Sequence, residues 1–178
     1  MISQNLRERL LNITNTYILD KTPEQLSKIE NLKNEGCPHS IVLHTEAVIG
    51  KPETFRFNCY MFALNLLGVK EMENIASKNA DIYPNSEYVR FLINNNILKK
   101  SKMDSGVIVY FDNNSPTHAG KINKGRVLSK WGLCHTWEHN VFEVPMSYGD
   151  KVEIFNEINT QESTEAFMKF AKWKGVSE

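Results

Sequence analysis

The spacing of hydrophobic residues along the chain changes near Met103. Before that position apolar residues recur every three or four positions, which is typical of amphipathic helices. After it they alternate with polar residues or form short continuous runs, as strands do. The predicted helices are 3–18, 22–34, 59–67, 86–100 and, near the end of the chain, 160–174. The predicted strands are 106–111, 118–122, 126–131, 141–144 and 151–155. Helices first and strands later predict an α+β fold with a small antiparallel sheet.

Cap and turn residues mark the ends of several of these elements. Thr22-Pro23 is a strong helix start, and Gly36 is expected to end the helix that follows it. Gly68 is expected to end the helix that covers 59–67. Residues 69–84 are interpreted as a polar connecting segment. The tripeptide Asn123-Lys124-Gly125 predicts the turn of a β-hairpin.

The order of elements divides the chain into three sections. Residues 1–36 are predicted to form a helical extension, 37–158 the core, and 159–178 a C-terminal helix packed on that core. A chain of 178 residues suits one domain with an extension and can bury a substantial core.

Composition excludes several classes of function. Lys plus Arg equals Asp plus Glu, at 21 each, so no basic excess points to nucleic acid. We expect no membrane span, and the polar start of the chain lacks the apolar core of a signal peptide. The protein is therefore expected to be cytoplasmic as synthesised, and an extracellular role would require a specialised secretion system. Cys37, Cys59 and Cys134 lack the spacing of a metal site and indicate a reducing compartment.

Cys59 and His118 are the strongest candidates for chemistry. Asn58 is a good N-cap, which would put Cys59 at a helix start, where the macrodipole favours a thiolate. His118 follows a loop and opens a predicted strand. A thiol at a helix start facing an imidazole on a strand is a geometry of cysteine acyl-transfer enzymes. The alternative interpretation makes Cys59 a small core residue and His118 an exposed strand-edge histidine.

The strand segments add a resemblance to a known family. Residues 104–111 (DSGVIVYF), 118–122 (HAGKI) and 125–129 (GRVLS) follow one another as in the NlpC-type cell-wall peptidase superfamily, which has a papain-like core. The resemblance covers about residues 55–155. Two departures stand out: Ser129 occupies the position of the residue that usually orients the catalytic imidazole, and Lys121 interrupts the apolar alternation. The segment after Ser129 is more similar to a divergent bacterial branch of unassigned function.

The resemblance implies a role for each of these residues. The Cys59 thiolate would attack a carbonyl carbon, His118 would act as general acid and base, and Ser129 would orient the imidazole. Counting along the hairpin is expected to bring Ser129 beside His118. The Cys59 amide would be the oxyanion donor, with Asn58 or His44 as an additional candidate.

The aromatic and histidine residues after this hairpin allow two interpretations. Trp131 and Trp137 are candidates for a wall of the substrate cleft, although core packing fits them equally well. His135 and His139 flank Trp137 at a spacing of four, but no helix is predicted there and the glutamate is misplaced for a zinc motif. We therefore expect His135 to line the cleft in a solvated loop, and we expect neither a metal nor a cofactor.

The leading functional hypothesis is a cysteine hydrolase that cleaves an amide bond in a peptide or a peptidoglycan stem peptide. A deamidase or acyltransferase of the same fold, acting as an exported effector or toxin, is the second hypothesis. The third is a catalytically inactive interaction module. The expected partners are a peptide or peptidoglycan fragment and a protein partner or inhibitor, but not nucleic acid.

Overall fold

The computed structural model describes residues 4–15 and 22–176. Within these ranges the helices are α1 (Gln4–Asn15), α2 (Thr22–Asn31), α3 (Cys59–Ala63), α4 (Lys70–Lys78), α5 (Ser86–Asn94) and α6 (Thr160–Trp173). The strands are β1 (Val42–Thr45), β2 (Ser105–Asp112), β3 (Ser115–Asn123), β4 (Arg126–Lys130), β5 (Thr136–Asn140) and β6 (Lys151–Phe155). Two 3₁₀ turns are η2 (Pro52–Thr54) and η3 (Met146–Tyr148). The last residues of the first predicted helix, 16–18, lie outside the described ranges.

The strands form one six-stranded sheet in the order β1-β5-β4-β3-β2-β6, and each neighbouring pair is antiparallel. The predicted α+β class is therefore confirmed. The hairpin turn is also found where it was predicted, with Lys124 and Gly125 at φ of 48° and 78°. Positive φ at both central residues is the backbone that a tight two-residue hairpin requires.

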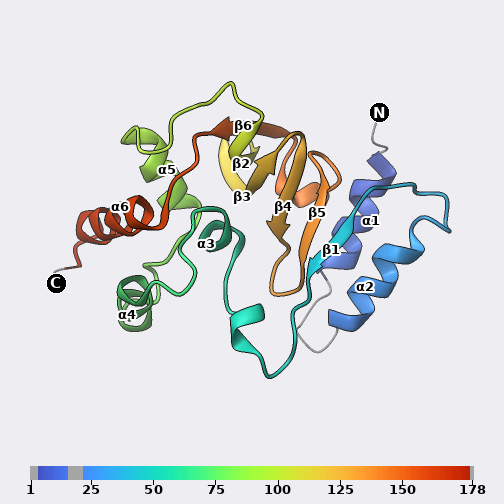
Figure 1. The fold of residues 1–178 in the computed structure, drawn as a ribbon, viewed down its shortest axis with the longest axis horizontal. Coiled ribbons are helices and arrows are strands. Elements are labelled where there is room, and N and C mark those ends of the chain that lie inside the picture. The colour runs from blue at the N-terminus through green and yellow to red at the C-terminus, as the bar shows by residue number, and fades with distance from the viewer. Residues whose placement is uncertain (1–3, 16–21, 177–178) are drawn as a thin grey trace.

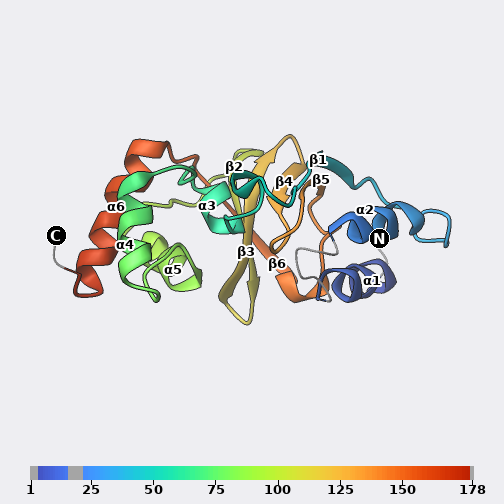
Figure 2. The same cartoon turned by 90° about the horizontal axis from the view of Figure 1, so that it is seen from below.

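The sheet separates two hydrophobic clusters, and the helices cover both of its faces (Figures 1 and 2). Successive strand residues point to opposite faces. Val107 and Val109 of β2 therefore join the cluster under α3–α6, whereas Ile108 and Tyr110 join the cluster under α1 and α2. Consequently α1 and α2 lie across the sheet from α3, and α6 packs into the cluster on the side of α3.

Helices α3 and α5 end earlier than predicted, and the same backbone motif ends both. In α3 the left-handed residue is Asn65, with φ of 56°, and the Leu66 amide donates back to the Met61 carbonyl at 2.9 Å. In α5 the equivalent residue is Asn96, with φ of 55°. This is the Schellman ending, in which asparagine can replace glycine because it tolerates the left-handed region. The prediction that Gly68 ends the Cys59 helix was therefore wrong.

Two other parts of the sequence-based prediction were wrong. The polar segment 69–84 contains α4, which is held on the core by Met72, its one fully buried side chain. The predicted strand 141–144 is a turn, and the strand β5 lies just before it. The turn is fixed by Glu143, whose carboxylate accepts from the Asn140 amide at 3.0 Å and the Ser40 amide at 2.9 Å.

None of the helices in the described ranges is both long and apolar enough to cross a membrane.

Candidate active site

Asn58 positions Cys59 at the start of α3. Its side-chain oxygen accepts from the Met61 amide at 2.9 Å, so the predicted N-cap is confirmed. Its Nδ2 donates to the Pro84 carbonyl at 2.7 Å. Asn58 therefore ties the helix start to the segment before α5, and its amide is not directed at a reacting carbonyl. Its assignment as an oxyanion donor was wrong for that reason.

The environment of Cys59 opposes the predicted thiolate. Burial raises the pKa of its thiol to about 11, and this outweighs a hydrogen bond from the Ala119 backbone amide that lowers the pKa. A five-residue helix supplies a weak dipole, whereas transfer of a charged sulfur out of water is costly. Cys59 therefore carries a neutral thiol near pH 7, with its sulfur against the backbone of β3.

His118 is also buried and neutral. It lies inside β3 opposite Tyr110, and only 2 % of its surface is exposed. Its ring stacks on that of Tyr148, with centroids 3.8 Å apart and an angle of 13° between the planes. Burial, followed by the charge of His139, holds the pKa of His118 well below its ordinary value. Its Nε2 is buried without a hydrogen-bond partner.

Tyr148 lies on the His118 side of the sheet. His118 pairs with Tyr110, whose side chain joins the cluster under α1 and α2, whereas Cys59 packs against the cluster under α3–α6. The Tyr148 ring covers the His118 imidazole, while its hydroxyl lies in the electrostatic field of the Cys59 and Cys134 sulfurs. Burial, and then these two sulfurs, raise the pKa of Tyr148 well above its ordinary value. In the described structure no hydrogen bond joins Cys59 to His118. The thiol is bonded instead to the amide of Ala119, the residue next to His118 in the chain.

The position of Tyr148 is fixed by the elements around η3. The Thr117 hydroxyl donates to the Tyr148 carbonyl at 2.6 Å. Gly149 has φ of 102°, and a Cβ at this position would lie 2.2 Å from the Phe111 carbonyl oxygen, so only glycine fits there. Arg7 of α1 donates to the carbonyls of Val144 and Gly149, on either side of η3. We call this contact the Arg7 clamp.

Ser129 does not orient His118, so its assignment was wrong. Its Oγ lies 2.8 Å from His139 Nε2 and accepts from Trp131 Nε1 at 3.0 Å. His139 Nδ1 lies 2.8 Å from the Asn140 carbonyl, which only accepts, so Nδ1 carries the proton and Nε2 accepts from the Ser129 hydroxyl. The cause is the register: Ile122 pairs with Val127, which brings Ser129 beside Gly120 rather than His118.

The residues predicted to line a substrate cleft are core residues. Trp131 and Trp137 are 0 % and 1 % exposed and pack in the cluster under α1 and α2, so core packing is the correct alternative. His135 is fully buried, and its Nδ1 accepts from the Ala47 amide at 3.1 Å. The predicted solvated loop around it is instead the start of β5. His44 is exposed on the edge strand β1 and bonds its neighbour Thr45 at 2.8 Å.

Among the described residues, no three His, Cys, Asp or Glu side chains come together in a way that could hold a metal ion. His135 and His139 use ring nitrogens to bond the Ala47 amide and the Asn140 carbonyl respectively.

Sequence reasoning missed Lys130, a fully buried lysine beside the site. Its ammonium donates to the Thr54 carbonyl at 3.0 Å and to the Cys134 carbonyl, and it lies 4.5 Å from the centre of the Phe57 ring. Burial lowers the pKa of Lys130 to about 8. The ammonium thereby joins the segment that leads into α3 to the β4–β5 turn. A lysine inside a predicted hairpin strand, 126–131, was the available signal.

The fold and these contacts define an α+β domain in which Cys59 packs on the α3 side of the sheet and the stacked His118 and Tyr148 rings lie on the Tyr110 side. The chain belongs to a family defined by a domain of unknown function, DUF7689, whose model matches residues 48–156. The matched segment contains α3–α5, β2–β6 and all three of these residues, and it leaves out α1, α2, β1 and α6. No curated protein and no solved structure matches the chain.

Proposed function

We propose that this protein is a cysteine hydrolase that acts on an amide bond, and that the structure represents its closed resting form. The observation that carries the proposal is the position of Cys59. The thiol lies at a capped helix start and is bonded to the amide of Ala119, directly beside His118 in the strand. The order of these residues in the chain resembles the NlpC-type peptidases and supports the same assignment.

The reaction would begin from a neutral thiol and a neutral imidazole. His118 Nε2, which has no hydrogen-bond partner, would take the proton from Cys59 as the sulfur attacks the carbonyl carbon. The Cys59 backbone amide, in the first turn of α3, would stabilise the oxyanion. The proton on His118 would then pass to the leaving nitrogen, and water would hydrolyse the thioester to regenerate the thiol.

In this form Tyr148 covers one face of the imidazole, and Tyr148→Ala would open that face to substrate. The proposed substrate is a peptide amide, including that of a peptidoglycan stem peptide. Deamidation and acyl transfer share the same thioester and differ in the bond that is cleaved or in the nucleophile that resolves it.

The test is capture of an acyl-enzyme. The full chain and its Tyr148→Ala variant are incubated with stem-peptide fragments and with a side-chain amide peptide, and the intact protein is analysed by mass spectrometry. An acyl adduct on Cys59 that disappears in Cys59→Ala and His118→Asn, but persists in Cys37→Ala, is expected. Cys37 is the matched control because it packs on the other face of the sheet. Turnover that survives Cys59→Ala would refute the proposal.

One specific observation favours a second candidate, a catalytically inactive interaction module. The thiol has a raised pKa, and the imidazole is buried beneath a tyrosine. If an activated thioester fails to acylate Cys59 even in the Tyr148→Ala variant, the module is the better assignment.

A further inference from the structure

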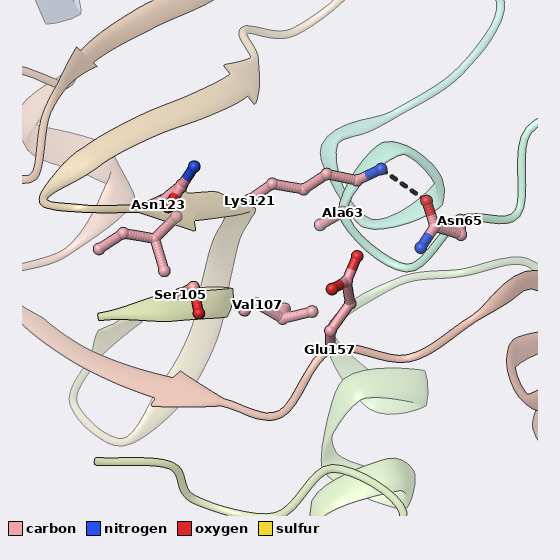
Figure 3. A pocket seen from close by; sticks show the side chains of 9 residues that line it. Ala63, Asn65, Ser105, Val107, Lys121, Asn123 and Glu157 are labelled. Atoms are coloured by element: carbon pink, nitrogen blue, oxygen red, sulfur yellow. Dashed lines mark hydrogen bonds between the residues drawn. The ribbon is translucent and has the colours of Figure 1, made fainter. Parts of the chain in front are cut away.

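A polar pocket of about 300 Å³ lies beyond the C-terminal end of α3 (Figure 3). Its floor is formed by residues of β2 and β3 that point to the same face of the sheet as α3. Its walls are formed by the end of α3 and by the segment after β6. The lining residues used below are Ser105, Val107, Lys121, Asn123, Asn65 and Glu157.

The Lys121 ammonium is held in place within this pocket. It donates to Asn65 Oδ1 at 2.5 Å and lies 5.2 Å from the centre of the Phe62 ring. Asn65 is itself fixed, because its backbone is the left-handed residue that ends α3 and its Nδ2 donates to the Ile158 carbonyl at 2.7 Å. The lysine that interrupts the apolar alternation of β3 is therefore a positioned cation at the end of a helix.

Glu157 brings the opposite charge to the same pocket. Its carboxylate points into the space that Lys121 borders (Figure 3). Gly106 permits the close approach of the end of β6, the strand just before Glu157, because a Cβ there would lie 2.1 Å from the Phe155 carbonyl oxygen. Burial lowers the pKa of Lys121, and the charge of Glu157 raises it. Of the ion pairs in the described residues, none joins these two groups.

We propose that this pocket binds a small zwitterion of the α-amino acid type, with its carboxylate on Lys121 and its ammonium on Glu157. A ligand with only one charge would leave the other protein charge unmatched, and a ligand with two like charges would be repelled by one wall. The volume is at the lower end of the range for ligand sites, about 300–1,000 Å³, which suits a small molecule. Ser105 and Asn123, paired across β2 and β3, offer neutral polar groups to the ligand side chain.

This site is separate from the Cys59 chemistry, and the inference does not rest on the proposed hydrolase activity. It is tested by titrating the full-length protein with L-alanine and following binding by calorimetry and by amide shifts of residues 121, 123 and 157. Propionate and ethylamine serve as matched probes, because each lacks one of the two charges. Saturable binding of alanine is expected, with both matched probes at least about tenfold weaker. Absence of saturable alanine binding, or equal binding of propionate, would overturn the proposal.

Two variants locate the contacts. Lys121→Met and Glu157→Gln are each expected to weaken alanine binding at least about tenfold. Loss of the Lys121 contact should leave residual ethylamine binding unchanged, and loss of the Glu157 contact should leave residual propionate binding unchanged. Lys172→Met and Glu53→Gln, at exposed positions elsewhere, are the charge-matched controls. Glu157 is exposed, so its isosteric variant keeps the test valid if Lys121→Met fails to fold. Unchanged alanine affinity in Glu157→Gln contradicts the assignment.

Discussion

The ring of Tyr148 lies parallel to the imidazole of His118, with centroids 3.8 Å apart and an angle of 13° between the planes. This contact shields one face of the imidazole from water and places a phenol near the Cys59 thiol. Cys59 and His118 do not form an ion pair, because the imidazole lies on the Tyr110 face of the sheet and the thiol packs on the α3 face. The predictions below concern this contact and the groups that hold it.

Tyr148→Ala is expected to return the pKa of His118 toward its ordinary value, because the ring would regain contact with water. The loss of packing should lower the free energy of unfolding by about 2 kcal/mol, less than for a fully buried aromatic residue. Histidine ring signals followed by NMR against pH measure the first effect, and thermal unfolding measures the second. Tyr83→Ala, at a tyrosine that is 43 % exposed, is the control. An unchanged His118 titration would mean that other groups exclude the water.

Cys59 is expected to react slowly with iodoacetamide near neutral pH, since its thiol pKa is raised to about 11. Below that pKa the thiolate fraction, and with it the labelling rate, should rise about tenfold for each pH unit. Peptide mass spectrometry after timed labelling separates Cys59 from Cys37 and Cys134. A rate that levels off below about pH 9 would show an activated thiol and contradict the burial argument.

Ser129→Ala is expected to destabilise the fold rather than to act through His118. The change removes the hydrogen-bond donor for His139 Nε2 and the acceptor for Trp131 Nε1, both of which are buried. A cost of about 1–3 kcal/mol in the free energy of unfolding follows from leaving such groups unpaired. Urea unfolding measures it, with the exposed Ser77→Ala as control. A variant as stable as the parent would indicate that another group replaces the hydroxyl.

Lys130 should make stability depend on pH in the alkaline range. Its pKa is about 8 in the folded protein and ordinarily 10.5 in an unfolded chain, so the folded protein releases the proton first. Between these two values the unfolded chain binds more protons, and a rise in pH therefore favours the folded state. The free energy of unfolding of the parent, minus that of Lys130→Met, should increase as the pH rises across this window. The same difference taken with Lys172→Met should show no such trend. A difference that stays flat would mean that the ammonium remains charged throughout.

The Arg7 clamp is expected to keep Tyr148 on His118. Arg7→Met removes bonds to two backbone carbonyls beside η3 and should cost about 2 kcal/mol. It should also increase the Cys59 labelling rate in the parent, but not in the Tyr148→Ala background. This lack of additivity would show that Arg7 acts on Cys59 through Tyr148. Arg56→Met, at an exposed position, is the control. Equal increases in both backgrounds would show that Arg7 acts on Cys59 by another route.

Local sequence patterns predicted the elements whose formation depends on near neighbours. The hairpin at Asn123-Lys124-Gly125, the Asn58 cap and the helix that is now α6 were all predicted correctly, since each is specified by a few adjacent residues. The asparagines that end α3 and α5 were visible in the sequence too. A rule that expects glycine at the left-handed residue after a helix does not identify them.

The arrangement around the site could not be predicted in this way, because it depends on contacts between distant segments. Ser129 was predicted to hydrogen-bond His118. The strand register differs from the predicted one by two residues, and Ser129 bonds His139 instead. The burial that raises the pKa of Cys59 comes from strands and turns far along the chain. An argument from the helix dipole considers only the residues of the helix and therefore omits this burial. Tyr148 carries no sequence signal, since its role follows from where η3 packs.

The sheet that divides the core also limits what the segment matched by the family model can do by itself. Residues 48–156 supply five of the six strands but neither Leu10 and Ile29, which cover one face, nor Phe167 and Phe170, which cover the other. A polypeptide cut to this segment would leave apolar surface on both sides and is expected to aggregate on expression. The part of the chain that the family model matches is therefore smaller than the unit that is expected to fold.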